Sequence, residues 1–182
     1  MLRSKSTAST SANPRRGWVA VAAAILVAAF VLYVSKVEPV SPLVRQVEYA
    51  SARLPRGFEG FRIVQLSDLH LGSFALQPGV VRRIVEQVNA LNPQLILFTG
   101  DLVNRRSSEL APFLPVLSQL QATHGVYAVM GNHDYGDYYR WPSSEVKRDN
   151  LLQFKKMVAQ MGWHLLDNAH CFIHCGGDSI AL

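Results

Sequence analysis

Three short apolar segments each lead directly into a polar motif, and amphipathic helical patterns separate them along the chain. The segments 61–66, 94–99 and 125–130 have the length and the aliphatic content of buried strands. Because strands that alternate with helices form parallel sheets through βαβ crossovers, we predict an α/β fold. The carboxyl ends of parallel strands lie at one edge of a sheet, so the three motifs are expected to meet there.

Helical patterns fill the intervals between these strands. Pro78 suits the first turn of a helix over 78–92, and apolar side chains recur on one face of that segment. Further helices are predicted at 110–121 and 145–161. Weaker patterns predict a first strand at 43–50, another strand at 163–166, and a hairpin that pairs 169–173 with 179–182.

An uncharged apolar stretch at residues 17–34 follows a basic N-terminus. As a helix it would be about 27 Å long, close to the thickness of the hydrocarbon core of a bilayer. Arg3, Lys5, Arg15 and Arg16 precede it without any acidic residue. This asymmetry predicts one transmembrane helix, with the N-terminus in the cytoplasm and the rest of the chain exported. A cleaved signal peptide and a buried core helix are the alternatives.

The sequence is therefore divided into four predicted parts. Residues 1–16 form a basic cytoplasmic tail, 17–34 the transmembrane anchor, 35–48 a linker and 49–182 the folded domain. Most of the net charge of +5 belongs to the tail, so a nucleic-acid-binding face is not expected on the domain. The bilayer is the expected partner of the anchor, and no obligate protein partner is predicted.

The three polar motifs carry side chains that bind metal ions. Asp68 and His70 are two residues apart just beyond the first strand, and Asp101 follows Gly100 at the end of the second. Asn132 follows the third strand and offers a neutral amide oxygen. Carboxylate, imidazole and amide groups in this order suit a dinuclear site, in which the ions lie ~3.5–4 Å apart.

The motif set resembles that of a known family. Asp68-Leu69-His70, Gly100-Asp101 and Gly131-Asn132-His133-Asp134 are similar to the motifs of the calcineurin-like metallophosphoesterases, in the branch with an N-terminal membrane anchor. The resemblance implies a β-sandwich with flanking helices, of which this chain supplies about the N-terminal half. The family pattern continues with a lone histidine and Gly-His-x-His, so we expect the domain 49–182 to be incomplete at its C-terminus.

The resemblance also implies a ligand set. Asp68 and His70 would bind one metal ion, Asp101 would bridge two ions, and Asn132 would bind the second. The two ions are implied to be manganese, iron or zinc, and the ligands do not choose among them. His164, His170 and His174 stand outside the family pattern and are interpreted as ordinary strand or turn residues.

The implied reaction is hydrolysis of a phosphate monoester or diester by a hydroxide that both metal ions activate. In this resemblance His133 stabilises or protonates the departing oxygen, and Asp134 orients His133. The predicted location at the cell membrane favours a lipid or envelope substrate. The alternative is a truncated, catalytically incomplete module that is tethered to the membrane for binding. The aromatic side chains after the third motif are interpreted as loop packing, with a substrate-gripping lip as the alternative: Tyr135, Tyr138, Tyr139 and Trp141.

Overall fold

The computed structural model describes residues 14–37, 42–75 and 77–182. The chain divides into two compact units, Met1–Val40 and Ser41–Leu182. Most of the predicted basic tail lies outside the described residues.

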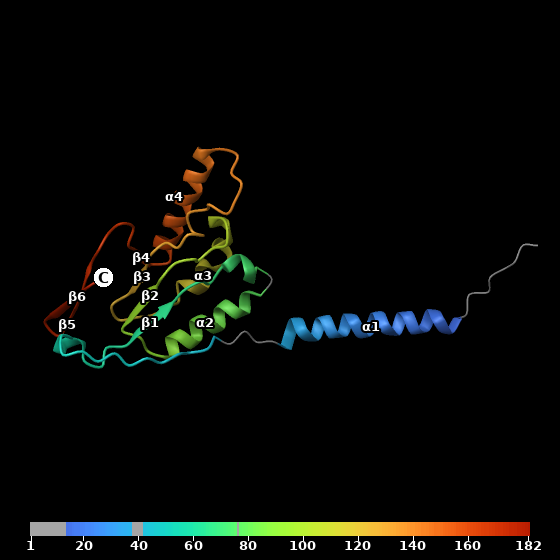
Figure 1. The fold of residues 1–182 in the computed structure, drawn as a ribbon, viewed down its shortest axis with the longest axis horizontal. Helices are drawn as coiled ribbons and strands as arrows, with labels where there is room; N and C mark the ends of the chain where they lie inside the picture. The colour runs from blue at the N-terminus through green and yellow to red at the C-terminus, as the bar shows by residue number, and fades with distance from the viewer. Residues whose placement is uncertain (1–13, 38–41, 76) are drawn as a thin grey trace, which may run out of the picture. The chain divides into compact units, whose positions relative to one another are not determined.

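The first unit contains helix α1, Pro14–Val37 (Figure 1). This helix includes the stretch 17–34 for which the sequence predicts a helix. A search of the described residues for a helix with the length and hydropathy of a membrane span finds none. The predicted helix is thus present, whereas the predicted membrane span is not found in the structure.

The second unit is built on a four-stranded sheet in the order β1-β2-β3-β4, and every neighbouring pair of strands is parallel (Figure 1). The parallel sheet confirms the predicted α/β class. The strands are shorter than the apolar segments that predicted them: β1 (Ile63–Leu66), β2 (Leu95–Phe98), β3 (Val126–Ala128) and β4 (His164–Leu165).

The connections between the strands contain helices α2 (Pro78–Ala90), α3 (Leu114–Leu117) and α4 (Ser144–Gln160). Helices α2 and α4 confirm the patterns at 78–92 and 145–161. The long helix predicted at 110–121 is wrong, because the segment forms a 3-10 turn, Ala111–Phe113, and then only α3. Two prolines explain the difference, since Pro112 and Pro115 have no N–H to donate to a continuous helix. Shorter 3-10 turns lie at Arg56–Phe58, Leu71–Phe74 and Ser107–Glu109.

The strand predicted at 43–50 is also wrong. The structure gives these residues no regular secondary structure, and Leu43 and Tyr49 are exposed to solvent. Val44 and Arg45 interrupt the alternation of apolar and polar side chains in this segment. Without a consistent apolar face, the segment has little to gain from pairing with the sheet.

The predicted hairpin is present as strands β5 (Phe172–Cys175) and β6 (Asp178–Ala181), which pair antiparallel. Gly176 and Gly177 connect them with φ values of 59° and 86°. A tight hairpin turn of this kind requires positive φ at both central residues, and glycine adopts it without strain.

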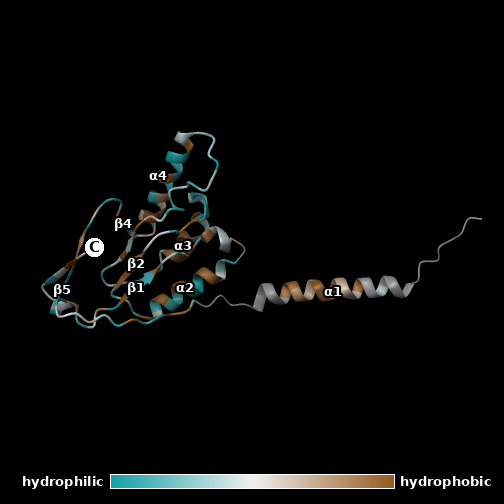
Figure 2. Ribbon diagram, viewed as in Figure 1, coloured by the Kyte–Doolittle hydropathy of each residue, from teal (hydrophilic) through white to brown (hydrophobic). Residues whose placement is uncertain are grey.

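The two faces of the parallel sheet pack against different layers. On β2, Ile96 and Phe98 join the core that the helices cover. Leu95, which precedes Ile96 on the same strand, packs instead with Phe58 of the Arg56–Phe58 turn and with Ile173 of β5. Figure 1 shows the β5–β6 hairpin and helices α2 and α3 on opposite sides of the sheet, and Figure 2 shows the apolar colour of the central strands. The second unit is therefore a three-layered α/β unit with one parallel sheet and one two-stranded sheet.

Candidate metal centre

The loops that leave β1 and β2 adopt an unusual backbone conformation side by side. Asp68, His70 and Asp101 have φ values of 55°, 44° and 60°, in the left-handed region that non-glycine residues rarely adopt. Backbone hydrogen bonds join the two loops, since Asp68 N–H donates to the Gly100 carbonyl and His70 N–H to the Asp101 carbonyl, both at 3.0 Å. Such local strain persists where surrounding bonds hold it, and it is common at functional sites.

The loop after β3 lies directly against the loop after β2. A Cβ atom at Gly100 would come within 2.5 Å of the backbone nitrogen of Gly131. A Cβ atom at Gly131 would overlap the Asp101 carboxylate. The glycines of the second and third motifs are therefore needed for the close contact between these two loops.

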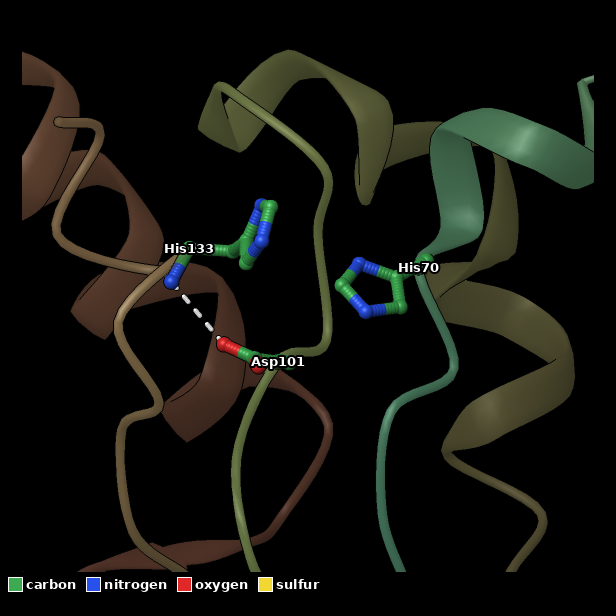
Figure 3. A group of neighbouring side chains, drawn as sticks. All are labelled: His70, Asp101 and His133. Atoms are coloured by element: carbon green, nitrogen blue, oxygen red, sulfur yellow. Dashed lines mark hydrogen bonds between the residues drawn. The ribbon is translucent and has the colours of Figure 1, made fainter. Parts of the chain in front are cut away.

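Three side chains from the three loops converge at this edge of the sheet (Figure 3). Ligand atoms of His70, Asp101 and His133 all lie within 4.8 Å of one another, and each residue is half-buried. The imidazole rings of the two histidines are nearly perpendicular, with centroids 4.7 Å apart. The backbone N–H of His133 donates to Asp101 Oδ1 at 2.9 Å, which links the second and third motifs directly.

The orientation of the His133 ring is set by Asn104. His133 Nδ1 lies 2.7 Å from the backbone carbonyl oxygen of Asn104. A carbonyl can only accept, so Nδ1 donates the proton, and Nε2 carries the free electron pair of the neutral ring. Glu109 holds Asn104 in turn, because its Oε2 accepts from the N–H groups of Asn104 and Arg105 at 2.7 and 3.2 Å.

Asp134 has a different place from the one that the resemblance implies. Its side chain is only 1% exposed. The carboxylate accepts four backbone hydrogen bonds of 2.9–3.1 Å, which come from Asp101, Leu102, Val103 and Gly131. The structure therefore places Asp134 as a clamp between the loops after β2 and β3, and the orienting contact to the His133 ring comes from Asn104.

Burial also affects the ionisation of Asp134. The pKa of this carboxyl is raised above its ordinary value chiefly because burial disfavours the charged form. The backbone N–H groups of Gly131, Val103 and Asp101 favour the charged form and lower the pKa in part. The nearby Asp101 carboxylate raises it further.

The other two predicted ligands lie at the edge of the cluster. The Asp68 side chain is 64% exposed, and its Oδ1 is 3.7 Å from His70 Nε2. Asn132 is exposed, and its Nδ2 donates to the hydroxyl of Tyr138 at 2.7 Å. Of the four ligands predicted from sequence, the structure thus brings His70 and Asp101 together, with His133 as the third member of the cluster.

The residues at the centre fit a metal ion. The His70 imidazole and the Asp101 carboxylate are donors that suit zinc, iron or manganese, and the His133 imidazole lies beside them. His70 Nδ1 is buried and makes no hydrogen bond within the part of the chain that the structure describes. A buried polar atom without a partner is costly in a folded protein, and a site for an ion is one of the settings in which it occurs.

Sequence reasoning missed Asn104 and Glu109. Both follow the second motif at positions without a recognisable pattern, and the contact of Asn104 is made through its backbone. In the structure Gly72 packs against both residues, because a Cβ atom there would crowd the side chains of Asn104 and Glu109.

Removal of the Asp134 clamp should destabilise the domain strongly. We expect Asp134→Ala to lower the free energy of unfolding by at least about 3 kcal/mol, because buried N–H groups that lose their acceptor cost about 1–3 kcal/mol each. Urea unfolding, followed by the fluorescence of the buried Trp163, measures the change.

Asp137→Ala is the matched control for this substitution. Asp137 forms an exposed ion pair with Lys147, and such pairs contribute less than about 1 kcal/mol. Equal stability losses for Asp134→Ala and Asp137→Ala would contradict the role of Asp134 as a clamp.

Several relatives share the sequence of this region. The chain is 38% identical over 117 residues to a transmembrane protein with metallophosphoesterase domain from Danio rerio, covering 63% of this chain and 26% of the relative. It is 37% identical over 91 residues to the uncharacterized metallophosphoesterase YkuE of Bacillus subtilis, covering 48% of this chain and 31% of the relative. It is 40% identical over 90 residues to the UDP-2,3-diacylglucosamine pyrophosphatase LpxG of Chlamydia muridarum, covering 47% of this chain and 27% of the relative.

The matched region spans only about a quarter to a third of the length of these relatives. The family model described as calcineurin-like phosphoesterase matches residues 61–179, which include all three motifs and the whole parallel sheet. With this match over most of its length, the chain belongs to the calcineurin-like phosphoesterase family.

Proposed function

We propose that this domain hydrolyses phosphoesters with the help of metal ions bound at the carboxyl edge of its sheet. The observation that carries the proposal is the convergence of His70, Asp101 and His133, whose ligand atoms lie within 4.8 Å of one another. These side chains come from loops after three neighbouring parallel strands, the position at which α/β sheets bind ligands. Membership of the calcineurin-like phosphoesterase family supports the same reaction.

His70 and Asp101 are the proposed central ligands, and Asp68 and Asn132 are proposed to complete the coordination. A bound ion supplies positive charge that stabilises the phosphoryl oxygens as the ester is hydrolysed. The Asp101 carboxylate lies close to the His70 and His133 side chains. The hydrogen bond from the His133 N–H holds its Oδ1 in position. The proposal of two ions, drawn from manganese, iron and zinc, rests on the resemblance of the motifs.

His133 is proposed to act on the departing oxygen through Nε2. The Asn104 carbonyl holds the proton of Nδ1, so exchange of a proton with the substrate is confined to Nε2. The Tyr138 ring lies on one face of the imidazole and restricts its rotation. When Nε2 also carries a proton, the imidazolium can pass it to the departing oxygen from a fixed position, and the ring returns to the neutral form with Nδ1 still bonded to Asn104.

Two substitutions separate metal binding from proton transfer. Asp101→Asn should weaken Mn²⁺ binding by more than the ~10–100-fold that loss of a supporting contact causes, and should abolish hydrolysis. His133→Gln should leave Mn²⁺ binding nearly unchanged but lower kcat by about 10²–10⁴-fold, the usual contribution of a general acid. Calorimetric titration of the full chain measures Mn²⁺ binding. Hydrolysis of p-nitrophenyl phosphate and its bis ester measures the effect of Asp101→Asn, and hydrolysis of phenyl phosphate, whose poor leaving group needs a proton, measures the effect of His133→Gln.

Asp149→Asn, an exposed position on α4, serves as the control for charge removal. Unchanged Mn²⁺ binding by Asp101→Asn would contradict the proposed centre. Equal loss of binding in Asp101→Asn and His133→Gln would make His133 a metal ligand instead of an acid.

A second candidate function is a binding module without turnover. The observation that favours it is the position of Asp68 and Asn132, which the structure leaves exposed and outside the central cluster. In this case the full chain would bind Mn²⁺ but hydrolyse neither nitrophenyl ester. Hydrolysis that depends on Asp101 would exclude it.

A lipid-linked phosphoester is the proposed substrate class. The support is the name of the Chlamydia muridarum relative, a UDP-2,3-diacylglucosamine pyrophosphatase. We expect kcat/KM to be at least about tenfold higher for UDP-diacylglucosamine than for the UDP-sugar without acyl chains, since burial of two methylene groups already gives this factor. Equal kcat/KM values for the two compounds, both measured in detergent micelles, would contradict a lipid-specific site.

We also propose that the chain is associated with the cell membrane, with the N-terminus cytoplasmic and the domain outside the cytoplasm. The support is the Danio rerio relative, which is named a transmembrane protein, and the uncharged stretch 17–34. A phosphatase reporter fused after residue 40 should be active only if it is exported, and the fusion should stay with membranes in alkaline carbonate. Release into the soluble fraction would overturn the proposal.

A further inference from the structure

Tyr138 contacts two adjacent residues of the proposed site in two different ways. Its hydroxyl accepts a hydrogen bond from Asn132 Nδ2 at 2.7 Å. Its ring stacks on the imidazole of His133, with centroids 4.1 Å apart and planes inclined by 13°. The side chain is nevertheless 54% exposed, so burial in a core does not explain where it lies.

The hydrogen bond decides which end of the Asn132 amide is available. An amide carries an oxygen that binds cations at one end and two N–H donors at the other. Rotation about the last torsion of asparagine exchanges the two ends, and this torsion is broad and loosely restrained. Because the tyrosine hydroxyl accepts from Nδ2, the amide oxygen Oδ1 is left for a ligand.

The turn that carries Tyr138 is itself braced against the third motif. The N–H of Gly136 donates to the His133 carbonyl at 3.0 Å, and Trp141 Nε1 donates to the Gly136 carbonyl at 2.6 Å. The Trp141 ring also contacts Tyr139 edge to face, with centroids 4.7 Å apart. These contacts hold the backbone on both sides of Tyr138 and allow its exposed side chain to keep a defined position.

We infer that Tyr138 is a positioning residue of the metal centre, which presents Asn132 Oδ1 to a cation and holds the His133 ring in place. The inference rests on the proposed function, because Asn132 is a ligand only if the centre binds metal. The inference gives Tyr138 a different role from its aromatic neighbours Tyr139 and Trp141, whose contacts stabilise the loop.

The first test is a double-mutant cycle on Mn²⁺ affinity in the full chain. Tyr138→Phe keeps the stacked ring and removes the hydroxyl, and it should weaken Mn²⁺ binding about tenfold, as loss of a contact that orients a ligand does. In the Asn132→Ala background the same substitution should cause no further loss. Tyr135→Phe, which removes a hydroxyl from the same loop, should leave the affinity unchanged.

Two results of the cycle would overturn the inference. One is unchanged Mn²⁺ affinity in Tyr138→Phe, and the other is an equal loss in the presence and absence of the Asn132 side chain. Urea midpoints of the two tyrosine variants should match that of the parent chain, because both side chains are exposed. A lowered midpoint for Tyr138→Phe alone would indicate a structural role and would also overturn it.

The second test uses the side-chain amide of Asn132 and needs no metal. In NMR spectra of the full chain, Tyr138→Phe should shift the NH₂ resonances of Asn132, whereas Tyr135→Phe should not. Tyr138→Leu should in addition shift the ring protons of His133, because the stacked aromatic ring is lost. If the parent chain binds no Mn²⁺, the proposed function fails. In that case the NMR experiment still tests the contact between Tyr138 and Asn132, and unshifted Asn132 resonances would refute it.

Discussion

The buried carboxylate of Asp134 is the interaction on which the candidate site depends. It accepts hydrogen bonds from Asp101, Leu102 and Val103 on one loop and from Gly131 on the next. The four donors offset part of the cost of burying the charged carboxylate, although burial still raises the pKa of Asp134 above its ordinary value. The backbone of two motifs is therefore fixed by protein groups alone, before any ion contributes. The contact of Gly100 with Gly131 and the bond from His133 N–H to Asp101 follow from this arrangement.

The left-handed backbone at Asp68, His70 and Asp101 is a second constraint of the same edge. Each such residue costs of order 1–3 kcal/mol, so the fold must supply compensating bonds nearby. The hydrogen bonds from Asp68 N–H to Gly100 and from His70 N–H to Asp101 continue the pairing of β1 with β2 beyond the end of the strands. The left-handed backbone directs the His70 and Asp101 side chains toward each other. If the strands continued regularly, these two side chains would lie on opposite faces of the sheet. Strain and ligand convergence thus have the same structural origin.

Sequence patterns predicted the scaffold better than the site. Buried strands and the helices α2 and α4 could be predicted because apolar side chains recur at the period of each element. The helix predicted at 110–121 was wrong because the prediction followed the apolar content of the segment. Pro112 and Pro115 lack the N–H groups that a continuous helix needs, so only a 3-10 turn and α3 form. At the site, the motifs identified the loops that meet but not the contacts of each side chain. Asn104 acts through a carbonyl that every residue possesses, so its role leaves no trace in residue type. The motif includes Asp134, but its residue type does not tell which groups the carboxylate binds.

The site consists of a rigid part and an adaptable part, and the difference matters for how it would take up an ion. Asp101 and His133 are tied to backbone groups, so they lose little conformational entropy when they bind a ligand. Asp68 and Asn132 are exposed, and their side chains can change rotamer without moving the strained backbone. Ordering one such side chain costs roughly 0.5–1.5 kcal/mol, which the Coulomb attraction of a carboxylate or an amide oxygen for a cation readily offsets. The exposed side chains therefore suit the completion of coordination after an ion has met the fixed Asp101 carboxylate, and the hydrogen bond to Tyr138 reduces this ordering cost for Asn132.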